Sequence, residues 1–130
     1  MAHFFDELTA AVRRKAAPVV VGLDPRWDQL PAALRSAGSP NPQQRAAAYE
    51  SFAKQVIDVV ASLVPAVKPQ AAFFEECGPA GMSALGEVMD YARQKELLVI
   101  LDGKRNDIGS TAAAYARGYL GRDSESPWQA

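Results

Sequence analysis

The sequence predicts an α/β fold in which about three β–α units follow an N-terminal helix. Three short apolar runs show no polar alternation, which is typical of strands with both faces buried. Segments with helical periodicity separate these runs, and helical crossovers of this length join parallel strands. No internal repeat or low-complexity tract interrupts the pattern. We therefore expect a parallel sheet with both faces covered.

The first half of the chain is expected to hold two helices and one strand. Residues 4–15 predict a helix, because apolar side chains recur there at helical spacing. The β-branched run 18–23 predicts a buried strand, which Pro25 must end because proline has no donor for the ladder. Residues 30–34 suggest one helical turn, and 43–63 predict a long helix.

The second half repeats the alternation twice. Residues 65–69 and 97–101 predict buried strands, and residues 81–95 and 110–120 predict helices. Five side chains of the last helix share one face, which we interpret as its core side: Ala112, Tyr115, Ala116, Tyr119 and Leu120.

We interpret residues 1–130 as a single partial domain. Three strands make a thin sheet, and a complete (β/α)8 TIM barrel needs about 250 residues. The residues alone leave two architectures open, the first part of such a barrel and a small open sheet.

Composition excludes several classes of protein. Fourteen basic and fifteen acidic side chains give a net charge of −1, which argues against nucleic-acid binding by a basic face. No apolar run approaches the roughly 18 residues that span a bilayer, and Asp6 and Glu7 argue against a secretory signal. A single cysteine, Cys77, and a single histidine, His3, exclude disulfide scaffolds and Cys/His metal folds. We expect a cytoplasmic protein with no metal, membrane or nucleic-acid partner.

Charged residues stand at the ends of all three predicted strands, namely Asp24, Lys68 and Asp102. Parallel α/β folds bind ligands at the carboxyl ends of their strands. Lys104 and Asp107 follow the third strand, so acids and bases alternate in this region. Alternation makes a charged cluster tolerable in a dry pocket, and it holds a lysine protonated and ready to deliver a proton.

Three blocks carry a resemblance to a known family: 22–25 (GLDP), 67–75 (VKPQAAFFE) and 102–111 (DGKRNDIGST). Together, and in this order, they resemble the orotidine 5′-phosphate decarboxylases, most closely the longer bacterial type. The resemblance extends from about Val20 to Tyr119. It implies the N-terminal half of a (β/α)8 barrel. It also implies conversion of orotidine 5′-monophosphate to uridine 5′-monophosphate and CO2 in pyrimidine biosynthesis, by a carboxy-lyase without metal or organic cofactor.

The resemblance also implies catalytic roles. Asp102 would face the substrate carboxylate, and Lys104 would protonate the carbanion left at C6. Lys68 and Asp107 would complete the alternating network, with Lys68 also orienting the ribose.

Binding residues and a partner are implied in the same way. Asp24 would bind a ribose hydroxyl. Asp107, Ile108 and Thr111 would reach the site of another subunit, which makes a homodimer with shared active sites. Later strands of the family supply the phosphate-binding arginine, so we expect residues 1–130 alone to lack decarboxylase activity.

Other functions remain open at this point. Related barrel decarboxylases and aldolases that act on sugar phosphates share the Asp-x-Lys-x-x-Asp block. They usually need magnesium and an extra acid on the second strand, where this chain has Lys68. A flavodoxin-like receiver module also has acids after its first and third strands, but Asp24 and Asp102 are 78 residues apart, too far for that pattern. A catalytically dead fragment is the third alternative. Each residue considered alone has an ordinary structural interpretation: Asp24 as a turn former, Lys68 as a surface lysine and Asp107 as a helix cap.

Overall fold

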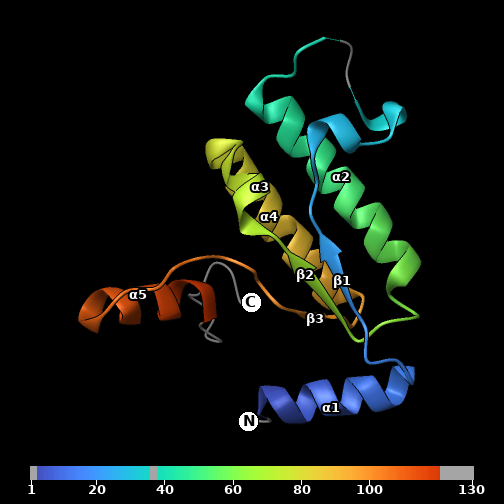
Figure 1. The fold of residues 1–130 in the computed structure, drawn as a ribbon, viewed down its shortest axis with the longest axis vertical. Helices are drawn as coiled ribbons and strands as arrows, with labels where there is room; N and C mark the ends of the chain where they lie inside the picture. Colours follow the sequence, from blue (N-terminus) through green and yellow to red (C-terminus); the bar gives the residue numbers. More distant parts are fainter. Residues whose placement is uncertain (1–2, 36–37, 121–130) are drawn as a thin grey trace.

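Three parallel strands form the sheet at the centre of the computed structural model, which describes residues 3–35 and 38–120 (Figure 1). In spatial order the strands are β1 (Val20–Leu23), β2 (Ala66–Pro69) and β3 (Leu98–Val99). The prediction of a parallel α/β sheet is confirmed. The third strand is shorter than the predicted 97–101, and beyond it the pairing continues as a single bridge between Gln70 and Asp102.

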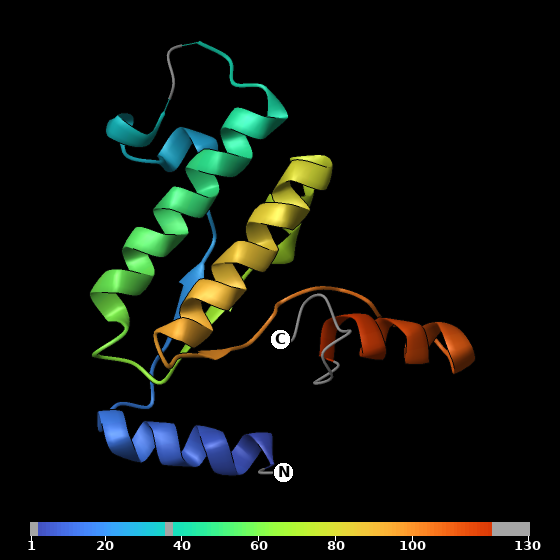
Figure 2. The same cartoon turned by 180° about the vertical axis from the view of Figure 1, so that it is seen from behind.

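Two long helices pack side by side over one face of this sheet (Figure 2). They are α2 (Pro42–Val60) and α4 (Gly78–Gln94), close to the predicted 43–63 and 81–95. The start of α2 is fixed by a capping box, because the Asn41 side chain accepts from the backbone of Gln44 and the Gln44 side chain accepts from the backbone of Asn41. Fully buried side chains fill the space between the helices and the sheet, among them Tyr49, Ile57, Leu85 and Met89.

A short helix that the sequence did not predict, α3 (Ala71–Glu75), lies between β2 and α4. It has five residues, too few to show helical periodicity. It packs closely on α4, since a Cβ at Gly81 would stand 1.8 Å from the carbonyl oxygen of Phe74. Only glycine permits this approach. Helix α4 begins at Gly78, three residues before the predicted start.

The opposite face of the sheet is open within the described residues. Val20 and Gly22 of β1 are exposed and Lys68 of β2 is half-buried, whereas their neighbours Leu23 and Val67 are buried under the helices. The expectation that both faces are covered is therefore wrong for this part of the chain. The reason is the common handedness of β–α–β crossovers, which delivers α2 and α4 to the same face.

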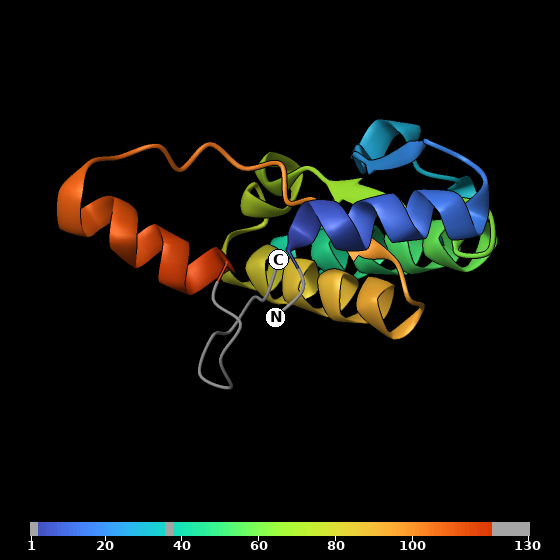
Figure 3. The same cartoon turned by 90° about the horizontal axis from the view of Figure 1, so that it is seen from below.

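Helix α1 (Phe4–Lys15) matches its predicted range and lies across the end of the structure where the strands begin (Figure 3). The Lys15 ammonium connects it to the end of α2 by donating to the carbonyl of Ala61, just after that helix, at 2.7 Å. Two short 3-10 turns, η1 (Trp27–Gln29) and η2 (Ala32–Leu34), follow β1 near the predicted helical turn.

Helix α5 (Gly109–Leu120) extends away from the other helices (Figure 1). None of its residues is buried, and Tyr115 is 38% exposed. Within the described residues the face that we interpreted as a core side is therefore not buried. Across the described ranges, no helix combines the length and the apolar character that crossing a membrane requires.

Candidate active site

Three charged side chains from neighbouring strand ends meet on the open face of the sheet. The ammonium Nζ of Lys68 lies 2.8 Å from Oδ2 of Asp102 and 4.0 Å from Oδ1 of Asp24. The pairing explains this meeting, since side chains alternate between the two faces of a strand. Lys68 is opposite Gly22, which leaves space beside the lysine, and Asp24 lies two residues further along on the same face.

The backbone of Asp102 is held on both sides, which fixes where its carboxylate stands. Its N–H donates to the carbonyl of Pro69 and its carbonyl accepts from the N–H of Ala71, both at 3.0 Å. These bonds join the third strand end to the start of α3. Lys68 therefore meets a carboxylate whose main chain is already anchored.

The pKa of Asp102 is lowered from its ordinary value of 3.8. The main cause is the hydrogen bond from Lys68; the positive charges of Lys68 and Lys104 and a hydrogen bond from Gln70 act in the same direction, and partial desolvation opposes them. The carboxyl is consequently ionised at neutral pH. Its side chain is 40% exposed, so water and salt screen these interactions in the described chain.

Gln70 is a site residue that the sequence analysis missed. It caps α3, where its side-chain oxygen accepts from the N–H of Ala72, and its backbone pairs with Asp102. The signal was present in the sequence, because Gln70 follows Lys68 by two residues and so points to the same face. It was overlooked because glutamine is an uncommon capping residue and α3 was not foreseen.

The other predicted residues follow Asp102: Lys104, Asp107 and Ile108 lie on the exposed segment before α5, and Thr111 lies in the first turn of α5. In the described part of the chain, no carboxylate lies within ion-pair distance of the Lys104 ammonium, although its charge is felt at Asp102. Asp107 does not join the Lys68 pair; its Oδ1 accepts from the N–H of Ile108 at 2.8 Å. Ile108 and Thr111 are exposed. The structure therefore brings together three of the predicted residues, Asp24, Lys68 and Asp102. It leaves the four residues described in this paragraph on the surface.

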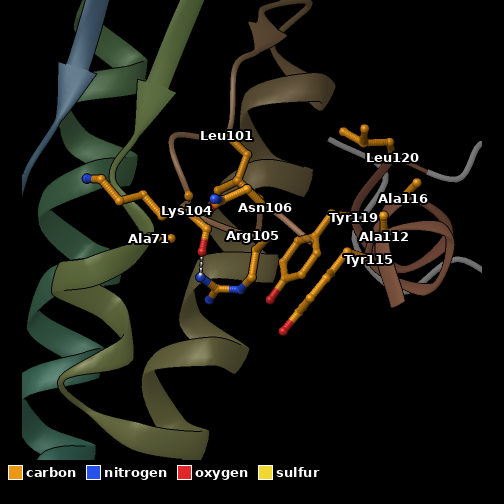
Figure 4. Close-up of a pocket in the computed structure, with 11 residues that line it drawn as sticks. Ala71, Leu101, Lys104, Arg105, Asn106, Ala112, Tyr115, Ala116, Tyr119 and Leu120 are labelled. Carbon is orange, nitrogen blue, oxygen red and sulfur yellow. Dashed lines mark hydrogen bonds between the residues drawn. The ribbon is translucent and has the colours of Figure 1, made fainter. Parts of the chain in front are cut away.

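A cavity of about 450 Å³ lies beside this segment, between residues 101–106 and α5. Leu101, Arg105, Tyr115 and Tyr119 line it, and Figure 4 shows the Lys104 side chain extending away from the two tyrosines. Asp24, Lys68 and Asp102 are not among the lining residues, so the cavity and the charged cluster are separate features, whereas Lys104 lines the cavity and its charge acts on Asp102. Among residues 3–35 and 38–120, no three His, Cys, Asp or Glu side chains cluster as metal ligands.

The sequence match to known proteins is extensive. Residues 17–127 match the model of the orotidine 5′-phosphate decarboxylase / HUMPS family. The chain belongs to this family. A relative named orotidine 5′-phosphate decarboxylase from Rhodopirellula baltica is 56% identical over 131 residues, and one of the same name from Nocardioides is 41% identical over 127. Each alignment covers 98% of this chain and 43% of the relative, so the chain spans less than half the length of these family members.

Solved structures of the family agree with the fold. A structure described as a putative orotidine 5′-phosphate decarboxylase from Streptomyces avermitilis superposes with a TM-score of 0.78 at 33% identity, covering 98% of this chain and 41% of the other. One from Toxoplasma gondii gives 0.75 at 31% identity, covering 96% and 38%. The predicted fold class, the N-terminal part of a (β/α)8 barrel with about three β–α units, is confirmed.

Proposed function

We propose that this chain supplies the charged part of the active site of an orotidine 5′-phosphate decarboxylase, a cofactor-independent carboxy-lyase of pyrimidine biosynthesis. The observation that carries the proposal is the position of Lys68 between Asp102 and Asp24, at the carboxyl edge of a barrel segment from this family. This edge is where barrel enzymes bind their substrates.

Lys104 is the proposed proton donor. When the bond between C6 of the pyrimidine and its carboxylate breaks, the electron pair stays on C6 and CO2 leaves. The Lys104 ammonium stabilises this anion and transfers a proton to C6, after which the amine takes a proton from water. The absence of a carboxylate within ion-pair distance of Lys104 in the described residues supports this role, because its charge stays available for the substrate. Exclusion of water would strengthen the interaction.

The other cluster residues are proposed to prepare the substrate for this step. Ionised Asp102 would face the leaving carboxylate, so that their repulsion is relieved as CO2 departs. Lys68 supports this by lowering the pKa of Asp102. Asp24, 4.0 Å from Lys68, would bind a ribose hydroxyl, and Lys68 would help to orient the ribose.

The proposed assembly is a homodimer with shared active sites, located in the cytoplasm. Asp107, Ile108 and Thr111 would reach the site of the partner subunit. The exposure of this segment supports the assignment: Ile108 is 85% exposed, and covering such an apolar side chain in an interface is favourable.

A chimera tests the proposal in a complete barrel. Residues 1–130 would replace the matching segment of the Rhodopirellula baltica relative, whose identity of 56% favours compatible packing. We expect the chimera to convert orotidine 5′-monophosphate in the presence of a chelator. Lys104→Ala should lower kcat by at least about 10³-fold, the usual scale for a proton donor that also stabilises charge. The binding of uridine 5′-monophosphate should weaken far less.

Lys95→Ala is the matched control, because Lys95 lies outside the site. It stands at the end of α4 and forms an ion pair with Asp58 of α2. The rate of this variant should equal that of the unmodified chimera. An inactive chimera beside an active parent enzyme would contradict the proposal. So would equal losses in turnover and in product binding for Lys104→Ala. Residues 1–130 without the remainder of a barrel should show no turnover, and a fully active monomer would refute the shared sites.

A further inference from the structure

The guanidinium of Arg105 joins three separate parts of the structure beside the candidate site. Its Nη1 donates to the backbone carbonyl of Lys104 at 2.8 Å, a bond visible in Figure 4. Its Nη2 forms an ion pair with Oε1 of Glu75 on α3. The ring centre of Tyr119 on α5 lies 5.6 Å from the guanidinium carbon, within reach of a cation–π contact.

We propose that Arg105 is a positioning residue for Lys104. Arg105 acts as a clamp that holds the segment of residues 103–107 to α3. The proposal rests on the proposed function, because it assigns Arg105 a part in the work of Lys104. Arg105 itself lies on the cavity side of the segment, whereas the Lys104 side chain extends away from that side (Figure 4).

The need for a clamp follows from the backbone. Asp102 is the last residue that the sheet ladder holds, and residues 103–107 make no backbone–backbone hydrogen bond within the described chain. A segment without such bonds keeps much of its conformational freedom, and its lysine is then poorly aimed. The bond from Arg105 to the Lys104 carbonyl restrains the main chain at the residue whose amine must be placed.

Glu75 is a suitable anchor, because α3 is fixed from several directions. The N–H of Ala71 donates to the carbonyl of Asp102, and the Gln70 side chain caps the helix. Phe74 is fully buried, and its backbone carbonyl lies close to Gly81. The side chains of Arg105 and Glu75 are 29% and 35% exposed, so the pair is partly shielded from water.

Arginine suits this role and lysine does not. Its planar fork can donate to a carboxylate and to a carbonyl at once while its face contacts an aromatic ring. A lysine in its place would keep one charge, but it could not make all three contacts. The clamp hypothesis therefore predicts that the conservative exchange fails to restore activity.

The kinetic test uses the chimera described above, with Arg105→Ala, Arg105→Lys, Glu75→Gln and the double variant Arg105→Ala/Glu75→Gln. We expect kcat to fall roughly 10- to 100-fold in Arg105→Ala, since misplacing a catalytic group by about 1 Å costs a factor of this order. KM should change less than about threefold, Arg105→Lys should restore little, and the double variant should be no worse than the poorer single variant. Arg93→Lys, in a pair with Asp90 on α4, is the control and should keep its rate.

A structural test on residues 1–130 separates failure of the clamp from failure of the function. Backbone order parameters from ¹⁵N relaxation should lie near 0.85 for residues 103–107 in the unmodified chain, and should fall below about 0.6 in Arg105→Ala and Glu75→Gln. Unchanged order parameters would overturn the clamp even if the chimera is inactive. Full activity in every Arg105 variant, with Lys104→Ala inactive, would overturn it while the proposed function stands.

Discussion

Replacing Gly81 with alanine should destabilise the fold strongly, because α3 and α4 approach each other through this glycine. The new Cβ would lie 1.8 Å from the carbonyl oxygen of Phe74 and 2.7 Å from its carbonyl carbon, and ordinary contact begins at 3.4 Å. The shortfall to the oxygen is 1.6 Å against backbone, which no side-chain rotation can relieve. Overpacking of this kind typically costs about 1–3 kcal/mol and sometimes more. We expect the upper end, about 3 kcal/mol.

Urea unfolding followed by tryptophan fluorescence, to which half-buried Trp27 contributes, measures this cost. With a slope of about 1–3 kcal/mol per molar urea, the midpoint should fall by roughly 1 M or more. Gly118→Ala in α5 is the matched control, because among the described residues a Cβ there meets no atom within 4 Å outside the backbone of its own helix. Its midpoint should stay the same or rise slightly, since alanine favours the helix. A Gly81→Ala variant within about 0.5 kcal/mol of the unmodified chain would refute the packing argument.

Three further predictions follow from individual contacts. Lys68→Met should raise the pKa of Asp102 toward 3.8, because the main cause of its lowering is removed. In the unmodified chain the pair of Lys68 and Asp102 stabilises the fold at pH values above the ordinary pKa of Asp102. This stabilisation is lost as the pH falls through the lowered pKa. A ¹³C titration of the Asp102 carboxyl would measure the pKa in both chains. Burial raises the pKa of the Cys77 thiol, so a thiol reagent should modify the native chain far more slowly than the urea-unfolded chain at pH 8. Asn41→Ala should lower the free energy of unfolding by about 1 kcal/mol because the capping box with Gln44 is lost, and Asn41→Ser should recover most of it.

Proline and apolar continuity made the sheet predictable from sequence. Pro25 follows β1, and Pro69 is the last residue of β2, which places both strands within two residues of the predicted ranges. Helix α3 could not be predicted, because its evidence is tertiary. Its cap is a glutamine, its length is five residues, and the need for glycine at position 81 appears only when Phe74 is already in place.

The candidate site divides in the same way. The meeting of Lys68 with Asp102 follows from parallel strands and from the alternation of side chains, both of which can be read from the sequence. The placement of the Asp107 side chain depends instead on a local hydrogen bond with the backbone. In the described chain its carboxylate bonds the next backbone N–H, ahead of the first turn of α5, so its part in the alternating network stays a prediction.

Helix α3 connects the segments that follow the three strands. Arg26, which follows β1, lies over the ring of Phe73 at 5.2 Å, and Arg105, which follows β3, pairs with Glu75. Both side chains contact the helix that directly continues the strand of Lys68. Helix α3 therefore contacts the chain segments that follow Asp24 and Asp102, the two carboxylates beside Lys68. Because Coulomb energies vary inversely with distance and with dielectric constant, such shared anchoring matters most when the open face is covered and water is excluded.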